Sequence, residues 1–126
     1  MSTTAAKYLD RFIWAYVACA LWSSNDESTP QGGEPLDNNY DSSDIAPEAL
    51  GKMTEDCKAF IDANKADLEG LDPSQCGHDF WLNRNGHGSG FWDRGYGDVG
   101  ERLKDASHKF KECNLYVGDD GKIYMM

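Results

Sequence analysis

Residues 3–22, TTAAKYLDRFIWAYVACALW, carry the clearest helical signal in the chain. Apolar side chains recur there at spacings of three and four, the period of one face of an α-helix. The apolar residues of this face are Tyr8, Leu9, Phe12, Ile13, Tyr16, Val17, Ala20 and Leu21. Thr3 or Thr4 caps the predicted helix, and a polar run ends it. Because Trp14 and Trp22 widen the apolar stripe, we expect this helix to lie at the centre of the core.

Three further helices are predicted by capping residues and apolar faces. The second begins near Asp44–Pro47 and ends before Gly70, a residue suited to the position after a helix. The third begins at Pro73, after an Asp that serves as its N-cap, and runs toward Asn83 or Asn85. The fourth begins near Asp98. The chain is thus predicted to be mostly helical.

A β-hairpin is predicted at the end of the sequence. Two short apolar runs, 115–117 and 122–125, flank a Gly-Asp-Asp-Gly turn. Together with the helices this predicts one α+β domain over residues 1–126, with about four helices and a C-terminal two-stranded antiparallel hairpin. In its core we expect Phe12, Tyr16, Leu21, Phe60, Leu68, Trp81, Leu103 and Phe110.

The negative charge of the chain is concentrated in its middle third. The formal net charge is −10, and residues 23–70 hold 12 acidic against 3 basic side chains. Within them, residues 23–43 form a predicted long polar, acidic loop with one Leu and one Tyr. Such a charge disfavours direct binding to nucleic acid or to an anionic membrane, because their phosphates would be repelled. A basic protein surface remains a suitable partner.

The cysteines and the N-terminus indicate the cellular compartment. Cys19, Cys57, Cys76 and Cys113 form no CxxC pair, so neither a zinc knuckle nor a thioredoxin motif is present, and we expect small buried side chains. The apolar run over 12–22 is too short to span a bilayer, and the N-terminus lacks the pattern of a secretory signal. We therefore expect a cytoplasmic protein with reduced thiols.

Residues 77–95, GHDFWLNRNGHGSGFWDRG, concentrate the rarest residue types of the chain. This segment resembles a small family of proteins encoded by bacteriophages and other mobile elements, which carry GHDFW, then RNGHG, then GFWDRG. Residues 114–124, NLYVGDDGKIY, are similar to the ending of that family, and the resemblance covers about 44–124. It implies a phage or mobile-element origin and a place in the cytoplasm of a bacterial host, and it names no reaction.

The same segment permits a chemical and a structural interpretation. In the chemical one, a histidine beside a carboxylate acts as a general base, or His78 and His87 with Cys76 or Asp93 bind a metal. In the structural one, the Phe-Trp pairs fix a glycine-shaped loop and the arginines pair with carboxylates. The candidate site residues are His78, Asp79, Arg84, His87, Asp93 and Arg94. Since no spacing matches a known signature, no catalytic residue, metal or cofactor is assigned.

The charge pattern predicts a binding protein. Carboxylates spread over a rigid face can imitate the phosphates of DNA and occupy a basic channel of a host defence complex, as anti-CRISPR proteins of the DNA-mimic kind do. The residues expected to bind the partner are Asp26, Glu27, Glu34, Asp37, Asp41, Asp44, Glu48, Glu55, Asp56, Asp62, Asp67 and Glu69. The alternatives are a small enzyme or metal-binding protein, an accessory phage interaction module, or acidic residues that serve solubility only.

Overall fold

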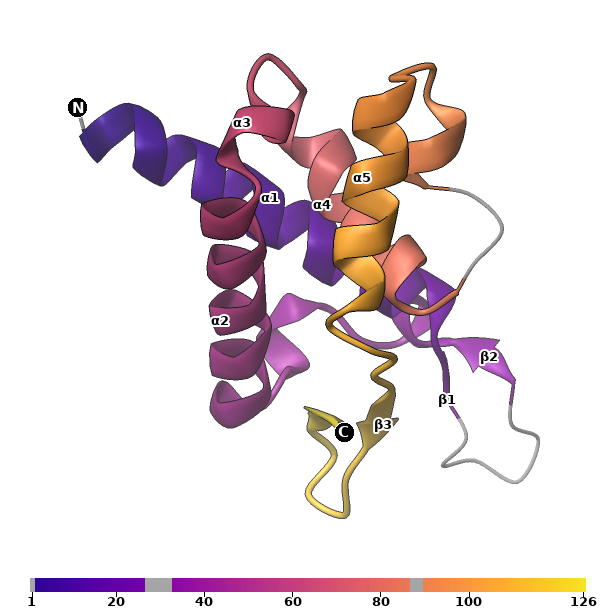
Figure 1. Ribbon diagram of the computed structural model, residues 1–126. Coiled ribbons are helices and arrows are strands. Elements are labelled where there is room, and N and C mark those ends of the chain that lie inside the picture. The colour runs from indigo at the N-terminus through magenta and orange to yellow at the C-terminus, as the bar shows by residue number, and fades with distance from the viewer. Residues whose placement is uncertain (1, 27–32, 87–89) are drawn as a thin grey trace.

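The computed structural model describes residues 2–26, 33–86 and 90–126 (Figure 1). The α-helices are α1 (Ser2–Ser23), α2 (Pro47–Ala63), α3 (Lys65–Leu68), α4 (Pro73–Arg84) and α5 (Asp98–His108). The strands are β1 (Asn25–Asp26), β2 (Glu34–Pro35), β3 (Leu115–Val117) and β4 (Ile123–Met125), and the 3₁₀ turns are η1 (Leu36–Asn38), η2 (Ser42–Asp44) and η3 (Phe91–Asp93). The protein is therefore α+β and mostly helical, with a C-terminal two-stranded antiparallel sheet, as its sequence predicts.

Helix α1 lies at the centre of the fold, where it packs against α4, α2 and η1 (Figure 1). Its most extensive contact is with α4, and Gly77 of α4 permits the close approach, because a Cβ atom there would collide with the backbone carbonyl of Phe12. Phe12 and Tyr16 are fully buried, and their rings lie 6.1 Å and 5.3 Å from the ring of Phe80. The prediction of a central first helix is confirmed.

The hydrophobic core contains nearly all the residues that the sequence assigns to it. Buried as predicted are Phe12, Tyr16, Leu21, Phe60, Leu68, Trp81 and Leu103. Phe110 is partly buried and packs edge-on against Phe80, with ring centroids 5.0 Å apart. The four cysteines are buried free thiols, again as predicted.

The outer side of α1 differs from the prediction. Trp14 and Trp22 do not widen the buried stripe, since 49% and 58% of their surfaces are exposed. They share the outer side with exposed Lys7, Arg11 and Ala18, at helical spacings of three and four. We call these five residues the outer stripe of α1.

The second predicted helix is in fact two helices that meet at Asn64. The Asn64 backbone leaves the helical region, with φ −127°, and its side-chain Nδ2 donates to the carbonyl of Phe60 at 2.8 Å. An Asn side chain that bonds to the backbone in this way competes with the next helical hydrogen bond. The short α3 that follows buries Leu68, and Gly70 then takes a positive φ of 82°.

Helix α4 begins as predicted and includes residues 77–84 of the segment 77–95, which we call the motif segment. The Asp72 carboxylate accepts a hydrogen bond from the backbone N–H of Gln75 at 2.9 Å, with Pro73 in the first position. The helix continues to Arg84. The predicted helix from Pro73 toward Asn83 or Asn85 is confirmed, and the further expectation of a glycine-shaped loop over residues 77–95 is wrong for 77–84.

Three of the four aromatic residues of the Phe-Trp pairs belong to the core. Phe80, Trp81 and Phe91 are buried, and the Trp81 indole N–H donates to the hydroxyl of Ser23 at 2.7 Å. Trp92 was expected to anchor the loop as well, but 46% of its surface is exposed. Consecutive residues of a 3₁₀ turn point about 120° apart, and in η3 Phe91 faces the core while Trp92 faces solvent.

The segment between α1 and α2 has more regular structure than its composition predicts. Residues 27–32 lie outside the described part of the chain. Beside them, β1 pairs with β2 in antiparallel orientation. Leu36 is fully buried, and its backbone N–H donates to the carbonyl of Ser24 at 2.8 Å. These contacts hold the acidic turns η1 and η2 close to α1.

The C-terminal hairpin forms where the sequence places it. β3 pairs with β4 so that Tyr116 lies opposite Tyr124. Asp120, in the turn between the strands, accepts a hydrogen bond from the Tyr124 hydroxyl at 2.6 Å. Its carboxylate therefore has a partner within the hairpin. A bridge between Ile45 and Ile123 joins the hairpin to the start of α2, at the lower edge of the molecule in Figure 1.

Candidate functional site

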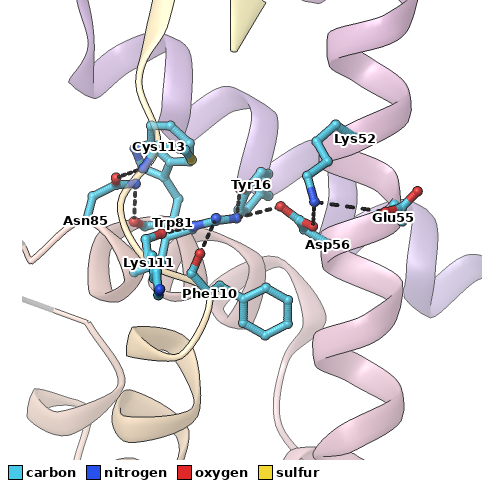
Figure 2. Close-up of polar contacts among 10 residues, drawn as sticks. Tyr16, Lys52, Glu55, Asp56, Trp81, Asn85, Phe110, Lys111 and Cys113 are labelled. Carbon is cyan, nitrogen blue, oxygen red and sulfur yellow. Dashed lines mark hydrogen bonds and ion pairs between the residues drawn. The ribbon is translucent and has the colours of Figure 1, made fainter. Parts of the chain in front are cut away.

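The side chain of Arg84, one of the candidate residues of the motif segment, is hydrogen-bonded to four groups of the same chain. Its Nη1 donates to Asp56 Oδ2 at 2.9 Å and to the Tyr16 hydroxyl at 3.0 Å. Its Nε and Nη2 donate to the carbonyls of Lys111 and Phe110, at 2.9 Å and 2.8 Å. Figure 2 shows the labelled partners Tyr16, Asp56, Phe110 and Lys111 arranged around it. The guanidinium therefore ties α4 to α1, α2 and the chain after α5.

The prediction that Asp56 faces a binding partner is wrong. The residue is 4% exposed, and its Oδ1 accepts a hydrogen bond from Lys52 Nζ at 2.8 Å (Figure 2). It lies on the buried face of α2, three residues after Met53 and four before Phe60. Its charge is balanced by Arg84 and Lys52, so it offers no charge to a binding partner.

A second buried carboxylate, Asp79, is paired in the same manner. Arg94 Nη2 donates to Asp79 Oδ1 at 2.8 Å and Arg94 Nε to Oδ2 at 3.1 Å, and Gln75 Nε2 adds a contact at 3.0 Å. His78 Nδ1 lies 3.6 Å from Asp79 Oδ1, which is too far for a hydrogen bond that would orient the imidazole. That nitrogen is buried and has no hydrogen-bond partner within the described residues, and its ring lies 6.3 Å from Trp22.

The remaining candidates of the motif segment are not brought together by the described structure. His87 and the side chain of Asp93 lie outside the described part of the chain. Asp79 and Arg84 both leave α4 but bind different elements, the loop at Arg94 and helix α2. The catalytic grouping therefore stays a prediction, and the arginine–carboxylate pairs of the structural interpretation are present.

The metal-binding alternative depends on Cys76 or Asp93 beside the two histidines. Burial, followed by the nearby charge of Asp79, raises the pKa of the Cys76 thiol to about 12. A metal needs the thiolate, so this environment disfavours Cys76 as a ligand. Over residues 2–26, 33–86 and 90–126, no group of three His, Cys, Asp or Glu residues is placed to hold a metal ion.

Gly90 of the motif segment allows close packing against the side chain of Asn83. Gly90 has φ +146°, and a Cβ atom there would collide with the side chain of Asn83. The Asn83 Oδ1 accepts the backbone N–H of Phe91 at 2.8 Å, which fixes the return of the chain toward the core. The dense composition of this segment thus reflects close packing around α4.

The predicted continuous acidic face of α2 is interrupted by basic residues. Glu55 Oε1 lies 3.9 Å from Lys52 Nζ. Asp67 of α3 forms a bidentate ion pair with Arg102 of α5, in which Nη2 donates to Oδ1 at 2.8 Å and Nε to Oδ2 at 3.0 Å. Exposed Lys58 also lies on this helix. Besides Glu55, the exposed acidic residues on α2 and directly after α3 are Glu48, Asp62 and Glu69.

The acidic turns between β2 and α2 carry no basic residue in their own sequence. Residues 12–51 contain no Lys, Arg or His and seven Asp or Glu residues. Of the predicted binding residues in this stretch, Glu34, Asp37, Asp41 and Glu48 are exposed and Asp44 is half-buried. Glu27 and the side chain of Asp26 lie outside the described part of the chain. We call the four exposed residues the acidic surface.

The backbone beneath the acidic surface is held in a fixed conformation. Asp41 and Asp44 form a reciprocal capping box around η2, in which Asp41 accepts the Ser43 N–H and Asp44 accepts the Asp41 N–H, both at 2.9 Å. The hydrogen bonds from the Ser43 hydroxyl and N–H lower the pKa of the Asp41 carboxyl, so it is ionised at neutral pH. The charges are consequently presented in a defined geometry.

The outer stripe of α1 is a surface feature that the sequence interpretation missed. Tryptophan is rarely exposed in soluble proteins, and it is enriched where one protein binds another. The signal was present in the sequence, because Lys7 and Arg11 share the helical face of Trp14 and Trp22, and a charged face points to solvent.

Comparisons of the chain with models of protein families, with curated proteins and with solved structures found no match. No helix in the described part of the chain is long and apolar enough to cross a membrane.

Proposed function

We propose that this chain is a binding protein that occupies a basic, nucleic-acid-binding surface of a host defence complex, as a phage-encoded inhibitor of the anti-CRISPR kind does. The observation that carries the proposal is the acidic surface, Glu34, Asp37, Asp41 and Glu48, on a stretch without a basic residue. Carboxylates on a fixed backbone can replace phosphates in a channel lined with Lys and Arg.

The location of this surface differs from the expectation based on sequence. The acidic residues of α2 and α3 are partly neutralised by Lys52 and Arg102. The acidic surface instead follows the segment from β2 to the first turn of α2, which crosses the lower part of the molecule in Figure 1. Competition with nucleic acid would therefore depend on Glu34, Asp37 and Glu48 more than on Glu55 or Asp62.

Two further observations support a binding role. The arginines of the motif segment are engaged by carboxylates of the same chain, which favours a structural role for Arg84 and Arg94. The resemblance of residues 77–95 to phage and mobile-element proteins supports a setting in which inhibitors of host defence are expected.

The test is protection of a phage in bacteria that carry an active CRISPR–Cas system directed against it. The chain is expressed in a panel of such hosts, each with one system, and we expect plaquing to recover in at least one. The variant E34K/D37K/E48K should lose this protection. The matched variant E55K/D62K/E69K, with the same change of charge on exposed positions of α2 and its surroundings, should keep it.

Purified components give the direct measurement. The chain is added to the effector complex of the protected host together with labelled duplex DNA, and we expect the DNA to be displaced. Displacement should weaken as salt rises, because exposed charges are screened over about 10 Å at 0.1 M salt. No protection in any host, or equal activity of the two charge-reversed variants, would overturn the proposal.

A further inference from the structure

A groove lies beside the acidic surface, between α1 and the turns η1 and η2. It encloses about 330 Å³. Helix α1 contributes an apolar side, and the segment of the two turns contributes one Tyr, one Ser and two Asp residues. The residues that line it are Trp14, Val17, Ala18, Leu21, Asp37, Tyr40, Asp41 and Ser42.

The apolar part of the groove is only partly covered by the chain itself. Val17 and Leu21 are buried and form its floor, whereas Trp14 is 49% exposed and Tyr40 is half-buried. Trp is enriched among the residues that contribute most to protein interfaces, and a concave apolar floor beside it can receive a side chain of a partner.

The charges at the groove restrict its occupant. Asp37 and Asp41 bring two carboxylates and the lining includes no Lys or Arg. Asp41 Oδ1 accepts hydrogen bonds from the backbone N–H and the hydroxyl of Ser43, while Oδ2 accepts no hydrogen bond within the described part of the chain. A purely apolar occupant would remove these carboxylates from water without replacing their hydrogen bonds, and an anion would be repelled.

We infer that this groove receives an arginine side chain of the basic partner, an inference that rests on the proposed function. The guanidinium stacks on the Trp14 or Tyr40 ring and donates to the carboxylates of Asp37 and Asp41, while its aliphatic stem covers Val17 and Leu21. A planar cation that both stacks and donates in pairs fits this set of groups better than a lysine ammonium does.

A second copy of the chain is the competing occupant. Arg11 is exposed on the outer stripe, one turn before Trp14, and could supply the arginine. The net charge of −10 opposes association of two copies. The experiment below separates this occupant from a basic partner.

The test uses a tetra-arginine peptide, a tetra-lysine peptide of equal charge and a tetra-citrulline peptide without charge. Each is titrated into the full chain at low salt, and binding is followed by NMR through the backbone amides and the Trp indole N–H signals. We expect the arginine peptide to shift the signals of Trp14, Asp37 and Tyr40. The lysine peptide should bind several-fold more weakly, and the citrulline peptide should not bind.

Two matched substitutions locate the contact. Trp14→Ala should weaken binding of the arginine peptide roughly tenfold, since both the stacking and the apolar cover are lost. Trp22→Ala removes a similarly exposed Trp from the same helix and should leave the affinity unchanged. Equal binding of the arginine and lysine peptides, with no effect of Trp14→Ala, would overturn the inference.

The outcomes also distinguish this inference from the proposed function. If both peptides bind equally and E34K/E48K, a variant that leaves the groove lining intact, alone abolishes binding, the acidic surface outside the groove recognises basic ligands and the groove does not. If the arginine peptide fails to bind, the groove inference is overturned, whereas phage protection still tests the function separately. If Trp14 signals change with protein concentration and sedimentation shows a dimer, the occupant is a second copy.

Discussion

The Arg84 guanidinium and the Asp56 carboxylate lie 28 positions apart in the sequence and meet inside the protein, with Nη1 2.9 Å from Oδ2. Their side chains are 5% and 6% exposed. The pair joins α4 to α2, and the other guanidinium nitrogens hold the chain that follows α5. A residue that the sequence offers as a catalytic candidate is thus bound into the core.

The first prediction concerns this pair. Asp56→Asn should lower the free energy of unfolding by about 3–5 kcal/mol, because the charge of Arg84 would remain buried without its partner. Urea denaturation measures the change. Asp62→Asn, at an exposed position of the same helix, is the control and should stay within about 0.5 kcal/mol of the parent. An Asp56→Asn protein as stable as the control would show that the ion pair does not hold the helices together.

The second prediction compares the two tryptophans of the Phe-Trp pairs. Trp81 is 2% exposed, and Trp81→Ala should cost about 3–5 kcal/mol of stability through loss of its buried ring. Trp92 is 46% exposed, so Trp92→Ala should cost less than about 1 kcal/mol. Denaturant melts of the two variants check the difference. Equal losses would contradict the assignment of only one of these rings to the core.

Local patterns were sufficient for the elements that depend on neighbours in the sequence. The start of α4 at Asp72 and Pro73 and the hairpin around Gly118–Gly121 follow from capping and turn preferences. The buried face of α1 follows from apolar spacing. Each of these is decided within a few residues of the position concerned.

The features that the sequence did not reveal depend on distant partners. The burial of Asp56 requires its ion pair with Arg84, which lies 28 positions further along the chain, so the residues next to Asp56 give no indication of it. Similarly, apolar spacing cannot tell whether Trp14 has a neighbouring element above it, and in the structure it does not have enough cover to be buried. The location of the acidic surface could have been predicted better from the absence of basic residues over 12–51.

The third prediction follows from the buried thiols. Burial, with a contribution from the charge of Asp79, raises the pKa of the Cys19 and Cys76 thiols to about 12, compared with about 8.5 in an unfolded chain. Between these values the folded protein keeps protons that the unfolded chain releases. The stabilisation is therefore complete below about pH 8.5 and is lost as pH rises toward 12.

We accordingly expect the melting temperature to fall as pH rises above about 8.5, and the native thiols to react slowly with a thiol reagent such as DTNB. Thermal melts across this range measure the slope. The double variant Cys19→Ala/Cys76→Ala serves as a comparison, since it should start from a lower stability and show a shallower decline. A melting temperature that is constant over this range would contradict the prediction, as would rapid labelling of all four thiols in the native protein.

The last prediction uses two glycines in helices as a matched pair. At Gly77 of α4, a Cβ atom would collide with the backbone carbonyl of Phe12, so Gly77→Ala must force α1 and α4 apart and should cost about 1–3 kcal/mol. At Gly51 of α2 a Cβ atom meets nothing within 4 Å, so Gly51→Ala should stabilise the protein by about 0.5–1 kcal/mol through the better helix propensity of Ala. Urea denaturation of both variants gives the two signs. If Gly77→Ala stabilised the protein as Gly51→Ala does, α1 and α4 would have to lie farther apart than the structure places them.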